Sequence, residues 1–137
     1  MKIIIETIKH SEQKYRTAGD YWREPDGTLR IVVSETGNNL FNSLVGLHEL
    51  VEVLLMERRG IPLITSNEFD IVFERERDAK LWVSTDEPGD DPRCPYRKEH
   101  RMASIVEELV AHDLGVDLDE YATAVNAMPY EPLHRER

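Results

Sequence analysis

Residues 44–56 are almost wholly apolar, yet they contain the run His-Glu-Leu-Val-Glu that begins at His48. Residues four positions apart on an α-helix share one face, so His48 and Glu52 lie one turn apart, with Glu49 about 100° round the helix. The same face carries apolar side chains, where a buried stripe is expected. A buried carboxylate needs a hydrogen bond or a counter-charge, and a bound divalent cation supplies one. The run therefore predicts a helix whose fold brings a metal ion or further polar groups to this face.

A second interpretation places the same helix beside a groove. His48 and Glu52 then face water, or pair with an arginine such as Arg59 or Arg101. Short runs of this kind also arise by chance, so a metal site needs at least one more ligand from elsewhere in the chain.

Turn signals and side-chain patterns place the strands first. Residues 3–8 are rich in β-branched side chains, and the turn signal Pro-Asp-Gly at 25–27 separates two short strands at 21–23 and 29–33. This pattern predicts a first strand followed by a hairpin. Strands first and helices later is the order of α+β proteins.

The helices are predicted from caps and stops. Asn38 and Asn39 are suitable N-cap residues for the first helix, which Gly60 ends, and Ser66 or Asn67 is the expected cap of the second. The acidic, proline-rich segment 84–95 is expected to be a solvated loop, with a flap or a second cation site as the alternatives. The prediction is one domain, 1–137, with strands and a hairpin (1–36), three main helices (39–60, 67–82 and 96–114), a short helix (119–128) and a frayed tail (129–137). The expected fold class is α+β, with a small antiparallel sheet, formed by the N-terminal strand and the hairpin, packed on three main helices.

The acidic balance of the chain constrains its partners. With 27 acidic and 17 basic residues the formal net charge is −10, so the protein repels a nucleic-acid backbone, and no basic patch is evident. Peptides, neutral molecules or cationic segments are the favoured substrates. No stretch reaches the roughly 18 uninterrupted apolar residues of a membrane span, so no membrane partner is expected. The sequence leaves the oligomeric state open.

The start of the chain and its cysteine indicate the compartment. The first residues turn polar at Glu6, without the long apolar core and cleavage site of a signal peptide. A lone cysteine, Cys94, excludes an intramolecular disulfide and fits a reducing environment. The cytoplasm is the predicted location.

His100 is the best candidate for a third ligand. Helical rotation places His100 and Glu107 on one face of the third helix, two turns apart, with Ala103 and Ser104 between them. Small residues permit close helix approach, so this face can meet His48. The predicted metal ligands are then His48, Glu52 and His100, with Glu107 as a fourth ligand or as a carboxylate that orients an imidazole.

Glu49 is left beside this group and not in it. A carboxylate there can take a proton from metal-bound water, so Glu49 is the predicted general base. Asp70, on the second helix, is a further candidate ligand. The plain alternative for His100 and Glu107 is a solvated helix surface that binds nothing.

The hairpin followed by a helix with His48-Glu49-x-x-Glu52 resembles the zincin metallopeptidases, in which a strand precedes a helix carrying His-Glu-x-x-His. The likeness covers residues 21–60, and Glu52 stands where that family has its second histidine. Glutamate is an accepted zinc ligand, so the resemblance implies a zinc site, while the substitution puts peptidase activity in doubt.

Nearly the whole chain is also similar to a group of small bacteriophage and prophage proteins of unassigned activity. The matching segments are 26–29, 48–52, 87–93, 95–100 and 114–117. This likeness implies a shared fold, and it implies the host cytoplasm as the location of a phage-encoded chain.

Three other metal-dependent classes fit less of the chain. His112-Asp113 resembles the His-Asp step of the HD phosphohydrolases, but those proteins are all-helical and need a distant downstream aspartate. Glu49 and Glu52 resemble one metal-binding pair of the all-α nucleotide pyrophosphohydrolases, and the second helix offers no matching pair. Carboxylate-bridged di-iron bundles need Glu-x-x-His twice, and the chain has none.

The sequence thus predicts a metal-binding protein, with a zinc-dependent, zincin-like hydrolase as the hypothesis for its activity. Zinc is the expected ion, and other divalent metals stay open. The alternative is a non-enzymatic phage interaction or assembly protein with a structural metal or none.

Overall fold

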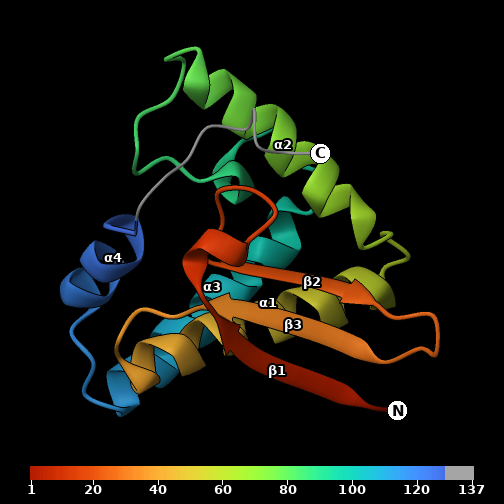
Figure 1. The fold of residues 1–137 in the computed structure, drawn as a ribbon, viewed down its shortest axis with the longest axis horizontal. Coiled ribbons are helices and arrows are strands. Elements are labelled where there is room, and N and C mark those ends of the chain that lie inside the picture. The colour runs from red at the N-terminus through yellow and green to blue at the C-terminus, as the bar shows by residue number, and fades with distance from the viewer. Residues whose placement is uncertain (129–137) are drawn as a thin grey trace.

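A computed structural model describes residues 1–128, and the predicted tail 129–137 lies outside the described residues. The described chain has a small three-stranded sheet and four α-helices, which confirms the α+β class. The strands are β1 (Ile3–Ile8), β2 (Gly19–Arg23) and β3 (Leu29–Ser34); the helices are α1 (Asn39–Arg58), α2 (Ile64–Asp78), α3 (Arg97–Asp113) and α4 (Leu118–Asn126), with single 3-10 turns η1 (His10–Glu12) and η2 (Pro88–Asp90) (Figure 1).

The sheet is mixed, so the prediction of an antiparallel sheet is wrong for one of its two pairings. β2 and β3 form the predicted antiparallel hairpin, but β1 runs parallel to β3, in the order β1-β3-β2. The reason lies in the connection: the segment 9–18 carries the chain past the position of β3, and the hairpin then inserts β3 between the other two strands. The hairpin turn itself forms as expected, with Gly27 at φ 89° and Asp26 Oδ1 accepting a hydrogen bond from Thr28 N at 2.9 Å.

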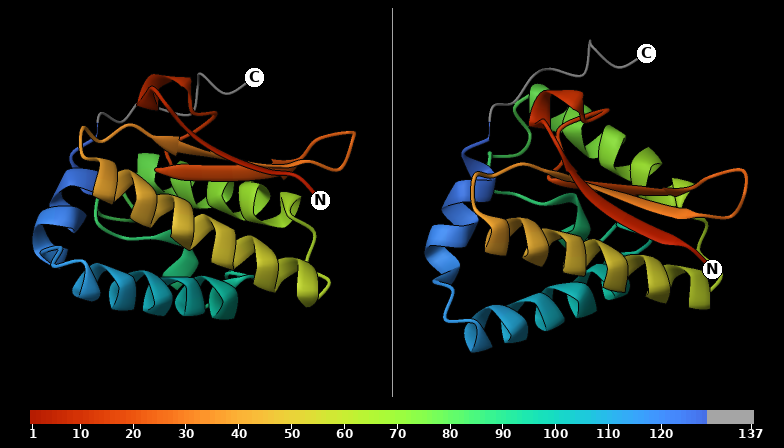
Figure 2. Two further views of the ribbon diagram at one scale, coloured as in Figure 1. Left: turned by 90° about the horizontal axis from the view of Figure 1, so that it is seen from below. Right: turned by 60° about the horizontal axis from the view of Figure 1, so that its bottom comes forward.

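Helix α1 lies between the sheet and α3, and this position explains its apolar sequence. It packs against β2 and β3 on one side and against α3 on the other (Figure 2). A helix covered on two sides needs apolar residues around most of its surface. Gly46 is the point of close approach to the sheet, since a Cβ there would lie 3.1 Å from Ile5 Cγ2.

The ends of α1 and α3 follow the predicted signals to within two residues. The Asn38 side chain caps α1 by accepting a hydrogen bond from Phe41 N at 3.1 Å. Gly60 and Gly115 have φ 73° and follow the last turns of α1 and α3.

Helix α2 begins and ends earlier than the predicted 67–82. It starts at Ile64, after the N-cap residue Leu63, and Ser66 lies inside its first turn, where its hydroxyl donates to Leu63 O at 3.0 Å. Lys80 adopts φ 68°, and Leu81 N donates to Glu76 O at 3.0 Å, which closes the helix in a Schellman motif without glycine. The end of this helix could not be predicted from the sequence, because glycine is the usual residue at the position of Lys80.

Helix α1 is also long and apolar enough to cross a membrane by length and composition alone. The core helix of a globular protein has the same composition, and α1 packs on the sheet and on α3. The absence of a membrane partner stays a prediction.

Candidate metal centre

Three ligand-type atoms converge where α1 meets α3. His48 Nε2 lies 3.2 Å from Glu52 Oε2 and 3.2 Å from His100 Nδ1, and His100 Nδ1 lies 2.9 Å from Glu52 Oε2. All three residues are buried. Ala103, with 0% exposure, is the small residue that lets the two helices approach. The structure thus brings His48, Glu52 and His100 close enough together to hold a metal ion.

The triangle of atoms has the dimensions of a metal site. A tetrahedral zinc ion with ligands about 2.0–2.1 Å away separates neighbouring ligand atoms by about 3.3–3.4 Å. The three observed separations of 3.2, 3.2 and 2.9 Å are slightly shorter. Only a small outward movement of the side chains is needed for an ion to contact all three atoms.

Glu107 orients His48 from the far side of its ring. Its Oε1 lies 2.8 Å from His48 Nδ1, and its Oε2 accepts a hydrogen bond from the Tyr121 hydroxyl. With the proton on Nδ1, the Nε2 lone pair points at Glu52 and His100. Two roles were predicted for Glu107, a fourth ligand or a carboxylate that orients an imidazole. Its contacts are those of the orienting carboxylate, and it is outside the group of residues that can hold the ion.

Tyr21 holds the other oxygen of Glu52. Its hydroxyl donates to Glu52 Oε1 at 2.5 Å, which leaves Oε2 for the two imidazoles. Burial opposes ionisation of Glu52, but the hydrogen bonds from His100 and His48 prevail and lower its pKa to about 2. Burial acts against the charged form of each histidine too, yet the carboxylates beside them raise the pKa of His48 well above its usual value and raise that of His100. The metal-free cluster therefore attracts protons, which an incoming cation displaces.

Glu49 lies beside the cluster without joining it. Within residues 1–128 its carboxyl group accepts no hydrogen bond from another side chain or the backbone, and it lies against Gly19, where a Cβ would come within 2.6 Å of it. Burial, followed by the negative charge of Glu52, raises the pKa of Glu49 well above its usual value. A carboxyl group held in this way keeps its proton to higher pH than an ordinary glutamate does.

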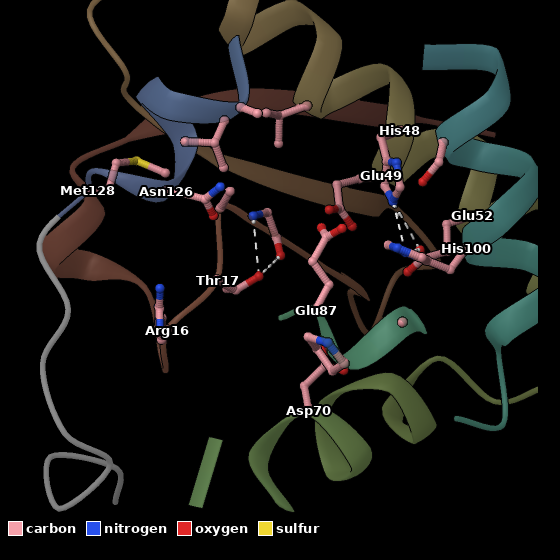
Figure 3. A pocket seen from close by; sticks show the side chains of 18 of the residues that line it. Arg16, Thr17, His48, Glu49, Glu52, Asp70, Glu87, His100, Asn126 and Met128 are labelled. Atoms are coloured by element: carbon pink, nitrogen blue, oxygen red, sulfur yellow. Dashed lines mark hydrogen bonds and ion pairs between the residues drawn. The ribbon is translucent and has the colours of Figure 1, made fainter. Parts of the chain in front are cut away.

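The cluster and Glu49 line a cavity of about 560 Å³. Glu49 enters it from α1, and Glu87 enters it from the opposite side, beside η2 (Figure 3). Burial raises the pKa of Glu87. Gly89 packs directly on the His100 ring, because a Cβ there would lie 2.3 Å from His100 Cγ. The segment expected to be a plain solvated loop therefore forms part of the cavity wall.

Asp70 lines the same cavity but does not join the three ligand atoms. Its two carboxylate oxygens accept hydrogen bonds from the hydroxyls of Tyr15 and Tyr96. Burial raises the pKa of Asp70 to about 7, although both hydroxyls act in the opposite direction. The candidate role of Asp70 as a ligand is not supported by these contacts.

Several residues of the site could not be picked out from the sequence. Tyr21, Tyr121 and Gly89 act through contacts between distant segments, and nothing in the spacing of the chain marks them. Tyr21 lies in the predicted hairpin strand, but a place in a strand does not show which side chain of another element it contacts.

The pKa of Asp70 predicts how stability depends on pH. A carboxyl group whose pKa rises from 3.8 to about 7 on folding contributes stability that is present at low pH and is lost as pH rises through about 7. The raised pKa values of Glu49 and both histidines act in the same direction. In EDTA, the free energy of unfolding should fall between about pH 5 and pH 8, by about 2–3 kcal/mol for Asp70 alone. Urea unfolding at a series of pH values measures this change.

Asp70→Asn is the control for that prediction. The amide does not ionise, so the free energy of unfolding of the variant should change much less with pH than that of the parent protein. An identical slope in the variant and the parent protein would show that Asp70 is ionised throughout this range.

Comparison of the chain with models of protein families, with curated proteins and with solved structures finds no match. The likenesses to zincin metallopeptidases and to phage proteins stay predictions. The function is therefore inferred from the geometry and chemistry of the site.

Proposed function

We propose that this protein is a zinc-dependent hydrolase, with His48, Glu52 and His100 as metal ligands and Glu49 as the general base. The observation that carries the proposal is that three converging ligand atoms and the carboxyl group of Glu49, which accepts no hydrogen bond within residues 1–128, lie on the wall of one cavity. A zinc ion in such a place polarises the group to be attacked and lowers the pKa of a bound water to about 7.

The ligand set favours zinc among the common divalent ions. Two imidazole nitrogens and one carboxylate oxygen are typical of catalytic zinc sites, whereas magnesium and calcium prefer oxygen ligands alone. Other transition metals bind such ligands too, and the order of affinities favours copper and zinc over manganese and iron.

The role of Glu49 follows from its surroundings. It has no hydrogen-bond partner among the described residues, so it would be available to take a proton from a water activated by a metal that His48, Glu52 and His100 hold. Burial and the negative charge of Glu52 raise its pKa, which makes it a stronger base than an ordinary carboxylate. Binding of a cation next to it will lower that pKa, which makes the carboxylate form available at neutral pH.

A catalytic site is favoured over a structural one because the cavity gives access to the cluster. A structural zinc site is closed by four protein ligands, while a catalytic site keeps one position for water or substrate. Here three residues could hold the ion. Glu107 could have supplied a fourth ligand, but it contacts His48 Nδ1 instead.

The cavity also suggests the substrate class. Its volume of about 560 Å³ suits a short peptide segment or a small molecule. Carboxyl groups outnumber basic side chains in its wall, with Glu87, Glu108 and Asp119 among them. Neutral or cationic substrates are therefore favoured over phosphorylated ones.

Metal analysis and thermal unfolding test the proposal. Protein purified without chelator should hold about one zinc ion per chain. Zinc at a thousandfold excess over its dissociation constant stabilises a folded protein by about 4 kcal/mol. For a domain of this size that corresponds to about 10–15 °C in the melting temperature, and EDTA should remove it.

The rise in melting temperature caused by zinc should depend on pH. Zinc displaces protons from His48 and His100, so the stabilisation by zinc should grow between about pH 6 and pH 8. Protein that holds no zinc and melts at the same temperature with zinc and with EDTA would contradict the proposal.

A further inference from the structure

The two imidazoles of the cluster differ in how their outer nitrogens are bound. His48 Nδ1 lies 2.8 Å from Glu107 Oε1. His100 Nε2 is buried and, among residues 1–128, has no hydrogen-bond partner. His100 is only 9% exposed, so solvent has little access to this atom.

Metal binding makes this unpartnered nitrogen a donor. His100 presents Nδ1 to the other two ligand atoms, and a neutral imidazole that offers a lone pair on Nδ1 carries its proton on Nε2. A buried N–H group without an acceptor is unfavourable. Metal-ligating histidines almost always donate this second N–H to a carboxylate, a carbonyl or water.

Asp90 is placed to be the missing acceptor. Its Oδ1 lies 4.0 Å from His100 Nε2, and its side chain is 70% exposed, so little surrounding structure opposes a change of its position. The neighbouring Gly89 packs on the His100 ring and fixes the backbone of η2 at that position. A movement of about 1 Å brings the two atoms to hydrogen-bond distance.

We propose that Asp90 accepts the Nε2–H of His100 in the metal-loaded protein and thereby orients Nδ1 toward the ion. Asp90 is then a positioning residue, and it does for His100 what Glu107 does for His48. The inference rests on the proposed function, because the Nε2–H becomes a fixed donor when the ion occupies Nδ1.

Glu87 suits this role less well. One of its ligand-type atoms lies within 4.8 Å of those of Asp90 and His100, so these three residues could also be considered as a second cation site. Such a site would use His100 Nε2 as a ligand and would require removal of its proton while Nδ1 holds another ion. An acceptor at Asp90 keeps that proton in place, and the Glu87 side chain points into the cavity toward Glu49 (Figure 3).

Zinc affinity measures the role of Asp90. Competition with a chromogenic chelator should give a zinc dissociation constant about 10–100-fold higher for Asp90→Ala than for the parent protein. Asp90→Asn keeps an oxygen that can accept the same hydrogen bond, so its affinity should stay within about threefold. Glu108→Ala is the matched control, because it removes one carboxylate from the cavity wall without a hydrogen bond or ion pair to His100, and its affinity should not change.

The metal-free proteins separate positioning from a general effect on folding. Asp90 is largely exposed, so the melting temperature of Asp90→Ala in EDTA should equal that of the parent protein. Gly89→Ala provides a second approach, since its Cβ must push η2 away from the His100 ring and should weaken zinc binding as well.

The outcomes distinguish this inference from the function on which it rests. Equal zinc affinities for Asp90→Ala and Glu108→Ala overturn the role of Asp90 and leave the zinc site intact. Equal losses in Asp90→Ala and Asp90→Asn also overturn it, because they reflect charge and not an acceptor. A parent protein that binds no zinc overturns both proposals.

Discussion

Replacing His48 by alanine is expected to abolish most of the zinc binding of this protein. His48 supplies one of the three ligand atoms, and its Nε2 lies 3.2 Å from each of the other two. If about 10–16 kcal/mol of zinc binding is shared among the three protein ligands, the loss of one ligand weakens binding by about 10²–10⁴-fold. The zinc-dependent rise in melting temperature should shrink accordingly, and calorimetric or chelator titrations measure the affinity directly.

The same substitution also lowers the stability of the metal-free protein. Removal of the ring takes away the His48 partner of Glu107, which keeps its hydrogen bond from Tyr121, and opens a cavity between α1 and α3. Removing one partner of a buried ion pair lowers the free energy of unfolding by about 3–5 kcal/mol. His48→Gln keeps a polar side chain of similar length, so it is the variant to use if the alanine variant does not fold.

His112→Ala is the matched control for both histidines. It lies on α3 as His100 does, but near the opposite end of the helix and exposed. Zinc affinity should be unchanged in this variant and should be lost to a similar extent in His48→Ala and His100→Ala. Loss of affinity in His112→Ala, or normal affinity in the other two, would place the metal elsewhere.

The ligand pair on α1 could be predicted because helix geometry is local. A spacing of four residues places His48 and Glu52 on one face whatever the rest of the chain does. The third ligand could be predicted because small residues beside His100 mark a face that another helix can approach. Ala103 is indeed fully buried there. The sequence did not state which of the remaining carboxylates would bind and which would orient.

The rest of the site depends on contacts that periodicity does not encode. Tyr21 reaches Glu52 from the sheet, and Tyr121 reaches Glu107 from α4. The segment of η2 has no repeating pattern, so its prolines and acidic residues indicate a loop but do not show that it covers His100. The parallel pairing of β1 was missed for the same reason, since strand order depends on the path of a connection and not on the strand sequences.

The structure also explains why the polar run stands within an apolar helix. Most buried side chains of α1 pack between the sheet and α3, while His48 and Glu52 face the polar groups of the cavity. Hydrogen bonds from Tyr21 and to Glu107 satisfy their outer atoms. The inner atoms converge on one another, close enough that a cation bound there would contact all three.

Replacing Glu49 by glutamine is expected to abolish turnover while zinc binding is retained. The amide has the size of the carboxyl group but cannot take a proton, and general-base catalysis contributes about 10²–10⁴-fold to rate. Zinc affinity should stay within about threefold, because Glu49 is outside the ligand group. Hydrolysis is measured on a pool of neutral and cationic peptides with the zinc-loaded parent protein, and then on the variant with the peptide that is cleaved.

A second readout of Glu49→Gln does not depend on the substrate. Glu49 has a pKa well above its value of 4.5 in the unfolded chain, so its contribution to stability is present below about pH 4.5 and is lost as pH rises through the folded pKa. The glutamine variant has no such loss, and in EDTA it should become more stable than the parent protein as pH rises toward 8. Glu108→Gln is the control for stability alone, and the pH dependence of the parent protein should persist in it. Full turnover in Glu49→Gln would remove Glu49 from the mechanism, while loss of zinc together with turnover would make it a ligand instead of a base.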